Sequence, residues 1–306
     1  MLQFAGVLGA LVVLATLTTI AIQFAGSRQA RTVIAAAAAT PAPARSSQVA
    51  LPSPPPPSPD PNLTAKLNAI IAASDARVAV TVVDLGGTPV TRVDIDATDS
   101  FVAASTYKLP LLMANAENIA RGVYKPSDRL CYKASEGEDG WFDDYDSGDC
   151  FTRQTLALRS GHFSDNTASH MLMDNLGGGA VLNAYALKHG ATHSAFFVPN
   201  QTCSADLAAL LVSVNSGAAG GQAAKDWLYP LLTNTAFEAG IPAGVPAGVT
   251  VVHKVGAVDD TVNDAGLVMG PKGGYVLVVM TDLLGGDAAY SLIAQISSAV
   301  WAAEAA

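Results

Sequence analysis

Residues 101–112 read FVAASTYKLPLL, and this segment predicts a buried helix that begins with a serine and a lysine one turn apart. Residues three positions apart lie on one face of a helix, so we expect the amine of Lys108 within reach of the hydroxyl of Ser105. Pro110 is compatible with a helix only near its start, which agrees with Ser105 in the first turn. The free N–H groups at a helix start favour a developing oxyanion. A serine beside an amine base predicts nucleophilic chemistry.

Two later segments add the remaining groups of an acyl-transfer site. Residues 164–166 read SDN, and residues 254–256 read KVG. Ser164 and Lys254 supply a second hydroxyl and a second amine, which can carry the proton onward. A serine three residues before a lysine is, taken alone, usually a solvated pair on a helix. Three such segments in this order are much harder to obtain by chance, and they indicate a serine acyl-transfer enzyme.

The three segments together resemble the Ser-x-x-Lys, Ser-Asp-Asn and Lys-Thr-Gly signature of the class A β-lactamases, which belong to the penicillin-recognising serine hydrolases. The resemblance extends over about residues 63–306. The family and the chemistry of the residues agree on their roles. Ser105 attacks the carbonyl and Lys108 takes its proton. Ser164 relays a proton to the leaving nitrogen, with Lys254 polarising it.

The resemblance also implies the groups that bind the substrate. Asn166 is expected to hydrogen-bond the side-chain amide of the substrate. The backbone N–H groups of Ser105 and of Ala257, which follows Gly256, are expected to form the oxyanion hole. The implied substrate is a β-lactam, and we expect no metal and no organic cofactor.

The chain departs from the family in the step that clears the acyl-enzyme. Active class A enzymes carry a glutamate in a loop after the second motif, which activates the hydrolytic water. Here no Asp or Glu occurs between residues 174 and 206. The loop 190–202 offers His193, which we interpret as a surface or packing histidine, and Asn200, which can position a water but cannot deprotonate it. We therefore expect slow deacylation.

The third motif lacks its hydroxyl residue. Val255 replaces the Thr or Ser that helps to hold the substrate carboxylate, and no arginine occurs between residues 254 and 272. An anionic substrate gains little binding energy here, because three acidic residues lie close by in the sequence. Either another cation such as His253 compensates, or the natural substrate differs. The acidic residues nearby are Asp259, Asp260 and Asp264.

The hydrophobic periods predict an α/β fold of the α+β kind. Helical spacing at 63–74 and 287–303 predicts helices at both ends of the domain, and residues 105–240 are mostly helical. The economical architecture is a five-stranded antiparallel sheet built from both chain ends, flanked by helices, with an inserted all-α lobe. Ser105, Ser164 and Lys254 would meet in the cleft between sheet and lobe. The predicted strands are 77–84, 89–94, 250–258, 262–269 and 275–282.

The N-terminal region is organised differently from the rest. Residues 2–26 contain no charged side chain and are long enough to span a bilayer, so we interpret 1–26 as a transmembrane anchor, with a cleaved signal segment as the alternative. Residues 27–62 are an Ala-, Pro- and Ser-rich linker, expected to be extended and semi-rigid. The hydrolase domain is expected at 63–306.

The location of the domain raises a conflict. Arg28 and Arg31 follow the apolar run and no basic residue precedes it, which by the positive-inside rule favours a cytoplasmic domain. The substrates of the proposed chemistry lie outside the cytoplasm, and we give this more weight. We expect a membrane-anchored or secreted protein with an extracytoplasmic catalytic domain that acts as a monomer.

The overall charge excludes one class of partner. The chain of 306 residues has a net charge of −9 and a sequence pI of about 4.8. An acidic surface repels phosphate backbones, so nucleic acid is not expected as a partner. Half of the residues are hydrophobic, enough for a large core.

The three cysteines leave two alternatives open. In an oxidising compartment Cys131 and Cys150 are candidates for a disulfide, which would stabilise the domain by about 3 kcal/mol and leave Cys203 free. Three reduced, buried thiols are the other alternative.

Acidic side chains crowd the segment between the first two cysteines. Their spacing fits no EF-hand, and we interpret the segment as a solvated loop near the cleft rim rather than a calcium site. The histidines at 162, 170 and 189 show no metal-ligand spacing. The acidic residues are Glu136, Glu138, Asp139, Asp143, Asp144, Asp146 and Asp149.

Three functions are compatible with these residues. The first is a serine hydrolase that opens β-lactams through an acyl-Ser105 intermediate. The second uses the same acylation on peptidoglycan stem peptides, as a D,D-peptidase does. The third is a penicillin-binding or sensor domain that stays acylated. The missing glutamate favours the second and third, and the order of the motifs favours the first.

Overall fold

The computed structural model describes residues 59–304. The predicted anchor and nearly all of the predicted linker lie outside this range. Within the described range, no helix has both the length and the hydrophobicity needed to cross a bilayer.

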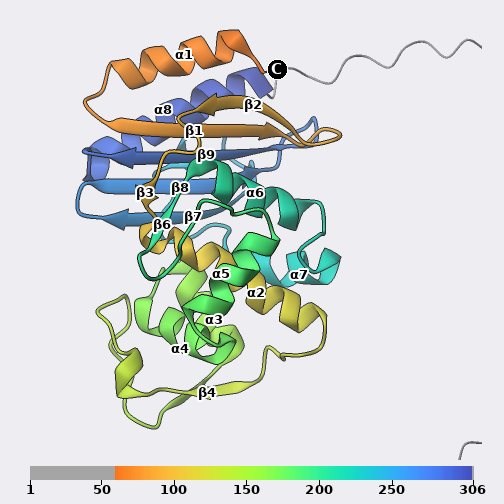
Figure 1. Cartoon of the computed structure of the whole chain (residues 1–306), viewed down its shortest axis with the longest axis vertical. Coiled ribbons are helices and arrows are strands. Elements are labelled where there is room, and N and C mark those ends of the chain that lie inside the picture. Colours follow the sequence, from red (N-terminus) through yellow and green to blue (C-terminus); the bar gives the residue numbers. More distant parts are fainter. Residues whose placement is uncertain (1–58, 305–306) are drawn as a thin grey trace, which may run out of the picture. The chain divides into compact units, whose positions relative to one another are not determined.

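Five strands form an antiparallel sheet in the order β2-β1-β9-β8-β7 (Figure 1). Both ends of the domain build this sheet, because β1 pairs with β9 along its whole length, from Arg77 opposite Asp282 to Asp84 opposite Tyr275. The predicted fold class is confirmed. The strands are Arg77–Asp84 (β1), Val90–Ile95 (β2), Val251–Val258 (β7), Thr261–Val268 (β8) and Tyr275–Asp282 (β9).

Helices cover both faces of the sheet, which explains why β8 and β9 are continuous runs of buried residues. On one face, Ile293 and Ile296 of α8 share a core with Leu277 and Val279 of β9, and α1 packs on α8. On the other face, α6 contacts β1, β8 and β9. Figure 1 shows α1 and α8 together on the side of the sheet away from the helical lobe. These helices are Pro61–Ala72 (α1), Ser204–Asn215 (α6) and Gly286–Glu304 (α8).

The inserted lobe is built around α2, whose residues 108–117 are all buried. Arg153, at the start of α3, is 1 % exposed and donates hydrogen bonds of 2.6 Å each to Asn115 on α2 and Asn175 on α4. Charge-assisted bonds of this kind fix three helices relative to one another. The lobe contains Lys108–Ala120 (α2), Arg153–His162 (α3), Asn166–Leu176 (α4), Gly179–Lys188 (α5) and Gly221–Leu228 (α7).

Two short ladders stand at the edge of the lobe. In one, β4 pairs with β5, and the paired residues Cys131 and Cys150 form a disulfide. Cys203 is free and buried, and burial raises the pKa of its thiol to about 11. In the other ladder, β3 pairs with β6 and brings the approach to Ser105 against the loop 190–202. These strands are Phe101–Val102 (β3), Arg129–Cys131 (β4), Cys150–Thr152 (β5) and Gln201–Thr202 (β6).

The start of the catalytic helix differs from the prediction. Ser105 lies in a 3₁₀ turn, η1 (Ala104–Tyr107), and α2 begins only at Lys108. Ala104 has a positive φ of 46°, a conformation that costs a non-glycine residue about 1–2 kcal/mol. The chain therefore enters the helix through a sharp turn that presents Ser105. The other 3₁₀ turns are Ala134–Glu136 (η2), Tyr229–Leu231 (η3) and Ile241–Gly244 (η4).

Candidate active site

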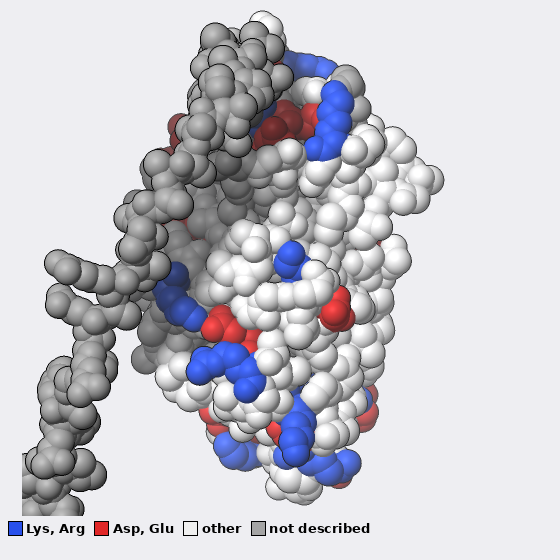
Figure 2. Space-filling model, turned by 90° about the vertical axis from the view of Figure 1, so that its right-hand side faces the viewer, with Lys and Arg blue, Asp and Glu red and all other residues white. Residues whose placement is uncertain are grey.

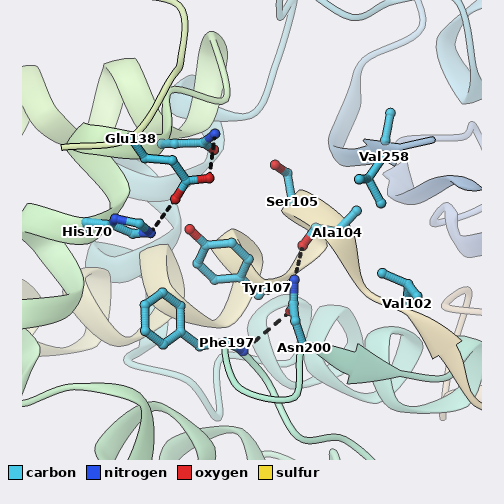
Figure 3. A pocket seen from close by; sticks show the side chains of 11 residues that line it. Val102, Ala104, Ser105, Tyr107, Glu138, His170, Phe197, Asn200 and Val258 are labelled. Atoms are coloured by element: carbon cyan, nitrogen blue, oxygen red, sulfur yellow. Dashed lines mark hydrogen bonds and ion pairs between the residues drawn. The ribbon is translucent and has the colours of Figure 1, made fainter. Parts of the chain in front are cut away.

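Ser105 lies where two cavities meet. The first, of about 320 Å³, is also lined by Tyr107, Glu138, His170 and Asn200, as Figure 3 shows. The second, of about 250 Å³, is lined by Ser164 and by several aromatic side chains. Asn166 and Ala257 border both. The Ser105 hydroxyl is thus open to a ligand from two directions. The aromatic residues of the second cavity are Trp141, Phe163, Phe237 and Tyr290.

The turn that carries Ser105 is fixed by its neighbours. Thr106 Oγ1 donates to the carbonyl of Ala103 at 2.6 Å, and Asn200 Nδ2 donates to the carbonyl of Ala104 at 3.1 Å. The backbone N–H of Ala103 in turn donates to the carbonyl of Asn200 at 2.9 Å. Asn200 is therefore a support for the nucleophile turn as well as a wall of the cavity.

Strand β7 touches this turn at Gly256. A Cβ at this position would lie 2.6 Å from the carbonyl oxygen of Ala103, 2.8 Å from the nitrogen of Thr106 and 2.9 Å from the nitrogen of Ser105. Only glycine allows so close an approach. β7 is an edge strand, so alternate N–H groups point away from the sheet. This contact places Ala257 beside Ser105, as an oxyanion hole made by their two N–H groups requires.

Lys108 is fully buried and bonded to the second motif. Its Nζ donates to the carbonyl of Ser164 at 2.5 Å and to Asn166 Oδ1 at 2.6 Å, and lies 3.4 Å from Ser164 Oγ. Within residues 59–304 it makes no hydrogen bond to Ser105, so the direct contact expected from the spacing is not formed. Burial lowers the pKa of Lys108 to about 7, although Asp165 and Glu138 act to raise it. A neutral amine is therefore accessible near neutral pH.

Lys254 completes a chain of proton carriers. Its Nζ donates to Ser164 Oγ at 3.0 Å and to the carbonyl of Val255 at 2.7 Å. Burial, together with the positive charge of Lys108, lowers its pKa well below the ordinary value. Ser164 has a positive φ of 58°, a strained conformation that persists where the surroundings enforce it. One hydroxyl is thereby held between two amines whose pKa values are both lowered.

Asp165 accepts hydrogen bonds from the acidic segment, residues 136–149, and so holds it beside the site. Its buried carboxylate caps α4 by accepting from the N–H of Ala168 at 2.8 Å, and it accepts from the hydroxyl of Tyr145 at 2.7 Å. It also accepts from the N–H groups of Trp141 and Phe142, each at 3.0 Å. The segment that follows Glu138 is therefore held against the second motif.

Both the oxygen and the nitrogen of the Asn166 side-chain amide form hydrogen bonds with protein groups. Its oxygen accepts from Lys108, and its Nδ2 donates to the carbonyl of Asp139 at 2.7 Å and to Glu138 Oε1 at 3.2 Å. Asn166 lines both cavities, in agreement with a substrate-binding role, but its first partners are protein groups.

The interpretation of residues 136–149 as a solvated loop is wrong for Glu136 and incomplete for Glu138. Glu136 is 5 % exposed and accepts from the N–H of Lys133 at 2.6 Å. Glu138 reaches into the first cavity, and its Oε2 lies 3.0 Å from Nε2 of His170 (Figure 3). Since no sequence motif links residues 138 and 170, only the fold reveals this pair.

Residues 62–303 match the family described as the β-lactamase enzyme family. The chain belongs to this family. The resemblance to the class A β-lactamases is confirmed by this match and by the fold. No functionally curated protein matches the chain significantly.

Solved structures share this fold. PBP-A is 27 % identical, with a TM-score of 0.75, and the match covers 81 % of this chain and 98 % of that one. A PBP-A variant solved as an acyl-enzyme complex with penicillin G has the same values. An ancestral class A β-lactamase, GNCA, is 26 % identical with a TM-score of 0.66, and the match covers 79 % of this chain and 99 % of that one. A β-lactamase from Sphaerobacter thermophilus is 24 % identical with a TM-score of 0.72, and the match covers 81 % of this chain and 98 % of that one. At this identity the likeness is one of fold. The chain is therefore a β-lactamase- and penicillin-binding-protein-like serine hydrolase by family.

Residues that set this chain apart from the family motifs are also placed by the structure. Val255 lines the second cavity, where the family has a hydroxyl. His253, considered as a compensating cation, has a fully buried side chain, 2.9 Å from Asp264 and 3.2 Å from Glu238. Burial lowers its pKa, but the two carboxylates outweigh burial and raise it to about 9. Its charge is neutralised within the protein, so the idea that His253 attracts the substrate is wrong.

A group of metal-type ligands lies outside both cavities. In the described residues, His193, Cys203 and Asp206 place one ligand atom each within 4.8 Å of the others. The Asp206 carboxylate already accepts from the N–H of His193 and the hydroxyl of Ser194, each at 2.7 Å. The raised pKa of Cys203 disfavours the thiolate that binds metals. The side chain of His193 is 54 % exposed, which agrees with the surface alternative in the interpretation of His193 as a surface or packing histidine.

Proposed function

We propose that the domain opens β-lactam amides through an acyl-enzyme on Ser105, with deacylation as the slow step. The observation that carries this proposal is the placement of Ser105 at the junction of two cavities, next to a serine held between two buried lysines. Both lysines have lowered pKa values, for which burial is the main cause. Buried amines of this kind act as proton acceptors in catalysis.

Acylation follows from these positions. Ser105 Oγ forms a bond to the carbonyl carbon of the substrate, and its proton passes to Lys108, which is partly neutral near pH 7. The oxyanion accepts from the N–H groups of Ser105 and Ala257. The carbon–nitrogen bond then breaks, and Ser164 gives its proton to the nitrogen. Lys254, 3.0 Å from Ser164 Oγ, polarises the hydroxyl for this transfer. Lys108, 3.4 Å from the same oxygen, then returns to Ser164 the proton that it took from Ser105.

The second cavity favours substrates with an apolar side. Trp141 contacts Phe163 and Phe237, with ring centroids 5.4 and 5.9 Å apart, and Tyr290 and Val255 continue this wall. The amine of Lys254 lies 6.0 Å from the centre of the Phe237 ring, but it is buried and bonded to Ser164. A substrate carboxylate therefore gains less here than in a site with a free hydroxyl and arginine. This supports weak binding of anionic penicillins.

A second candidate is a D,D-peptidase or penicillin-binding domain that acylates and releases product very slowly. Two observations favour it. The loop 190–202 contains no Asp or Glu, and the chain is similar to PBP-A, a variant of which was solved as a penicillin G acyl-enzyme.

We also propose that the domain works outside the cytoplasm, tethered by residues 1–26. The Cys131–Cys150 disulfide supports an oxidising compartment. Figure 2 shows a face on which basic and acidic side chains are sparse and interspersed, without a continuous basic patch among its described residues. Such a face offers little to a nucleic acid.

Two assays separate the candidate functions. Hydrolysis of nitrocefin measures β-lactam opening, and release of D-alanine from a model stem peptide measures peptidase activity, each with S105A as control. We expect slow nitrocefin hydrolysis with an initial burst. Rapid steady-state turnover without a burst would contradict slow deacylation, and D-alanine release alone would favour the peptidase.

A further inference from the structure

Release of an acyl group from Ser105 needs a base for water, and the usual loop does not supply one. Residues 190–202 include no carboxylate, and the Asn200 amide is bonded to the backbone of Ala104 and Phe197. Burial raises the pKa of Tyr107, so its hydroxyl stays protonated. Among the described residues that line the first cavity, Glu138 is the carboxylate.

Glu138 is held in place by both its backbone and its side chain. Its N–H donates to Thr167 Oγ1 at 3.1 Å, and its carbonyl accepts from the same hydroxyl at 2.9 Å. Its two carboxylate oxygens contact Asn166 and His170 at 3.2 and 3.0 Å. All three partners belong to α4, the helix that begins with the second motif. The carboxylate is therefore pre-positioned relative to Ser164 and Lys108.

The Glu138 carboxylate has further hydrogen-bond acceptor positions on the side of the cavity. Two carboxylate oxygens offer about four acceptor positions, of which Asn166 and His170 occupy two. The side chain of Glu138 is 51 % exposed, so water reaches it. Figure 3 shows Glu138, the Tyr107 hydroxyl and Ser105 around the same space. The charge of Glu138 is close enough to raise the pKa of Lys108, the base proposed for acylation.

We propose that Glu138 is the general base of deacylation, entering the site from a different loop than the family's glutamate. This inference rests on the acyl-Ser105 intermediate. A water oxygen bonds to the acyl carbon while one water proton passes to Glu138. The bond between the carbon and Ser105 Oγ then breaks, Lys108 gives a proton to that oxygen, and Glu138 passes its proton to Lys108. One water is consumed, and both side chains return to their starting states.

The geometry also explains why this step remains the slow one. Two of the acceptor positions of Glu138 are engaged by α4, and the carboxylate borders bulk water. A base in this environment is weaker than one that is desolvated and aimed at a single water.

The matched pair E138Q and D139N tests this role. Glutamine keeps the shape and can still contact Asn166 and His170, but it cannot accept the proton. Asp139 has the neighbouring carboxylate, and it contacts Asn166 only through its backbone carbonyl, so D139N removes the same charge without altering that contact. The full-length protein is acylated with a fluorescent penicillin, and the labelling rate and the lifetime of the label are measured separately.

We expect E138Q to label within about threefold of the wild-type rate and to keep the label about 100-fold longer, the usual contribution of a general base. D139N should behave as wild type. Added formate should shorten the lifetime of the label on E138A, which a structural role does not predict. A labelled E138Q with the wild-type lifetime, or E138A without rescue, would overturn the role of Glu138 alone. A wild-type protein that is never labelled would overturn the acyl-Ser105 proposal and this inference together.

Discussion

Gly256 is the position where a single methyl group tests the geometry of the oxyanion hole. In G256A, the new Cβ would meet three backbone atoms, those of Ala103, Ser105 and Thr106, at 2.6–2.9 Å. Ordinary contacts with a Cβ begin at about 3.4 Å. Because backbone cannot rotate away as a side chain does, β7 and the Ser105 turn must separate by several tenths of an ångström.

This separation moves the N–H of Ala257 away from that of Ser105. Loss of one oxyanion donor costs about 3 kcal/mol of barrier, or about 100-fold or more in rate. We therefore expect the rate of acylation by a fluorescent penicillin to fall by about 100-fold in G256A. Overpacking should also lower the free energy of unfolding by about 1–3 kcal/mol.

The control is G87A, in the turn between β1 and β2. A Cβ at Gly87 would meet no heavy atom within 4 Å. Stopped-flow labelling of both variants, with urea unfolding to confirm that they are folded, separates the effects. Acylation of G256A within threefold of wild type would refute the proposed contact between β7 and the nucleophile turn.

Three further predictions concern Lys108, His253 and the disulfide. The rate of acylation should rise with pH up to about 7 and then level off, since Lys108, with its pKa lowered to about 7, must lose its proton to act as a base; a rate that falls across this range in a stopped-flow pH series would exclude Lys108. The pKa of His253 is raised to about 9 in the folded protein, against 6.5 for a free histidine. Its pairing with the two carboxylates therefore stabilises the fold fully below about pH 6.5. This stabilisation, roughly 3 kcal/mol, is lost as the pH rises through 9. Urea unfolding at several pH values should show this loss in the wild type and not in H253N. The same change of the free energy of unfolding with pH in both proteins would contradict it. Removing the disulfide in a C131A/C150A double variant should lower the free energy of unfolding by about 3 kcal/mol, as expected for a 19-residue separation, with little change in acylation; no change in the urea midpoint would contradict the constraint.

Much of the fold is encoded in local patterns that can be interpreted without coordinates. The continuous apolar run of β9 and the long amphipathic helix α8 are predictable because burial on a sheet face or a helix stripe imposes a period. The three motifs are recognisable because Ser105, Ser164 and Lys254 keep residue types that the chemistry requires.

The rest depends on contacts between distant segments. Glu138 reaches the site because Asp165 accepts hydrogen bonds from the segment that follows it, an arrangement that no local period indicates. His253 is neutralised by Asp264, which pairs with β7 from the neighbouring strand. Ser105 lies in a 3₁₀ turn because Gly256 and Asn200 hold the chain there. These tertiary contacts decide which charged residues face the cavity.

Intact mass spectrometry of the wild type and of S105A after incubation with penicillin G tests the central claim most directly. The wild type should gain the mass of one penicillin, and peptide mapping should locate the adduct on Ser105, while S105A should gain none. A wild type without an adduct, or an adduct that persists in S105A, would contradict the account.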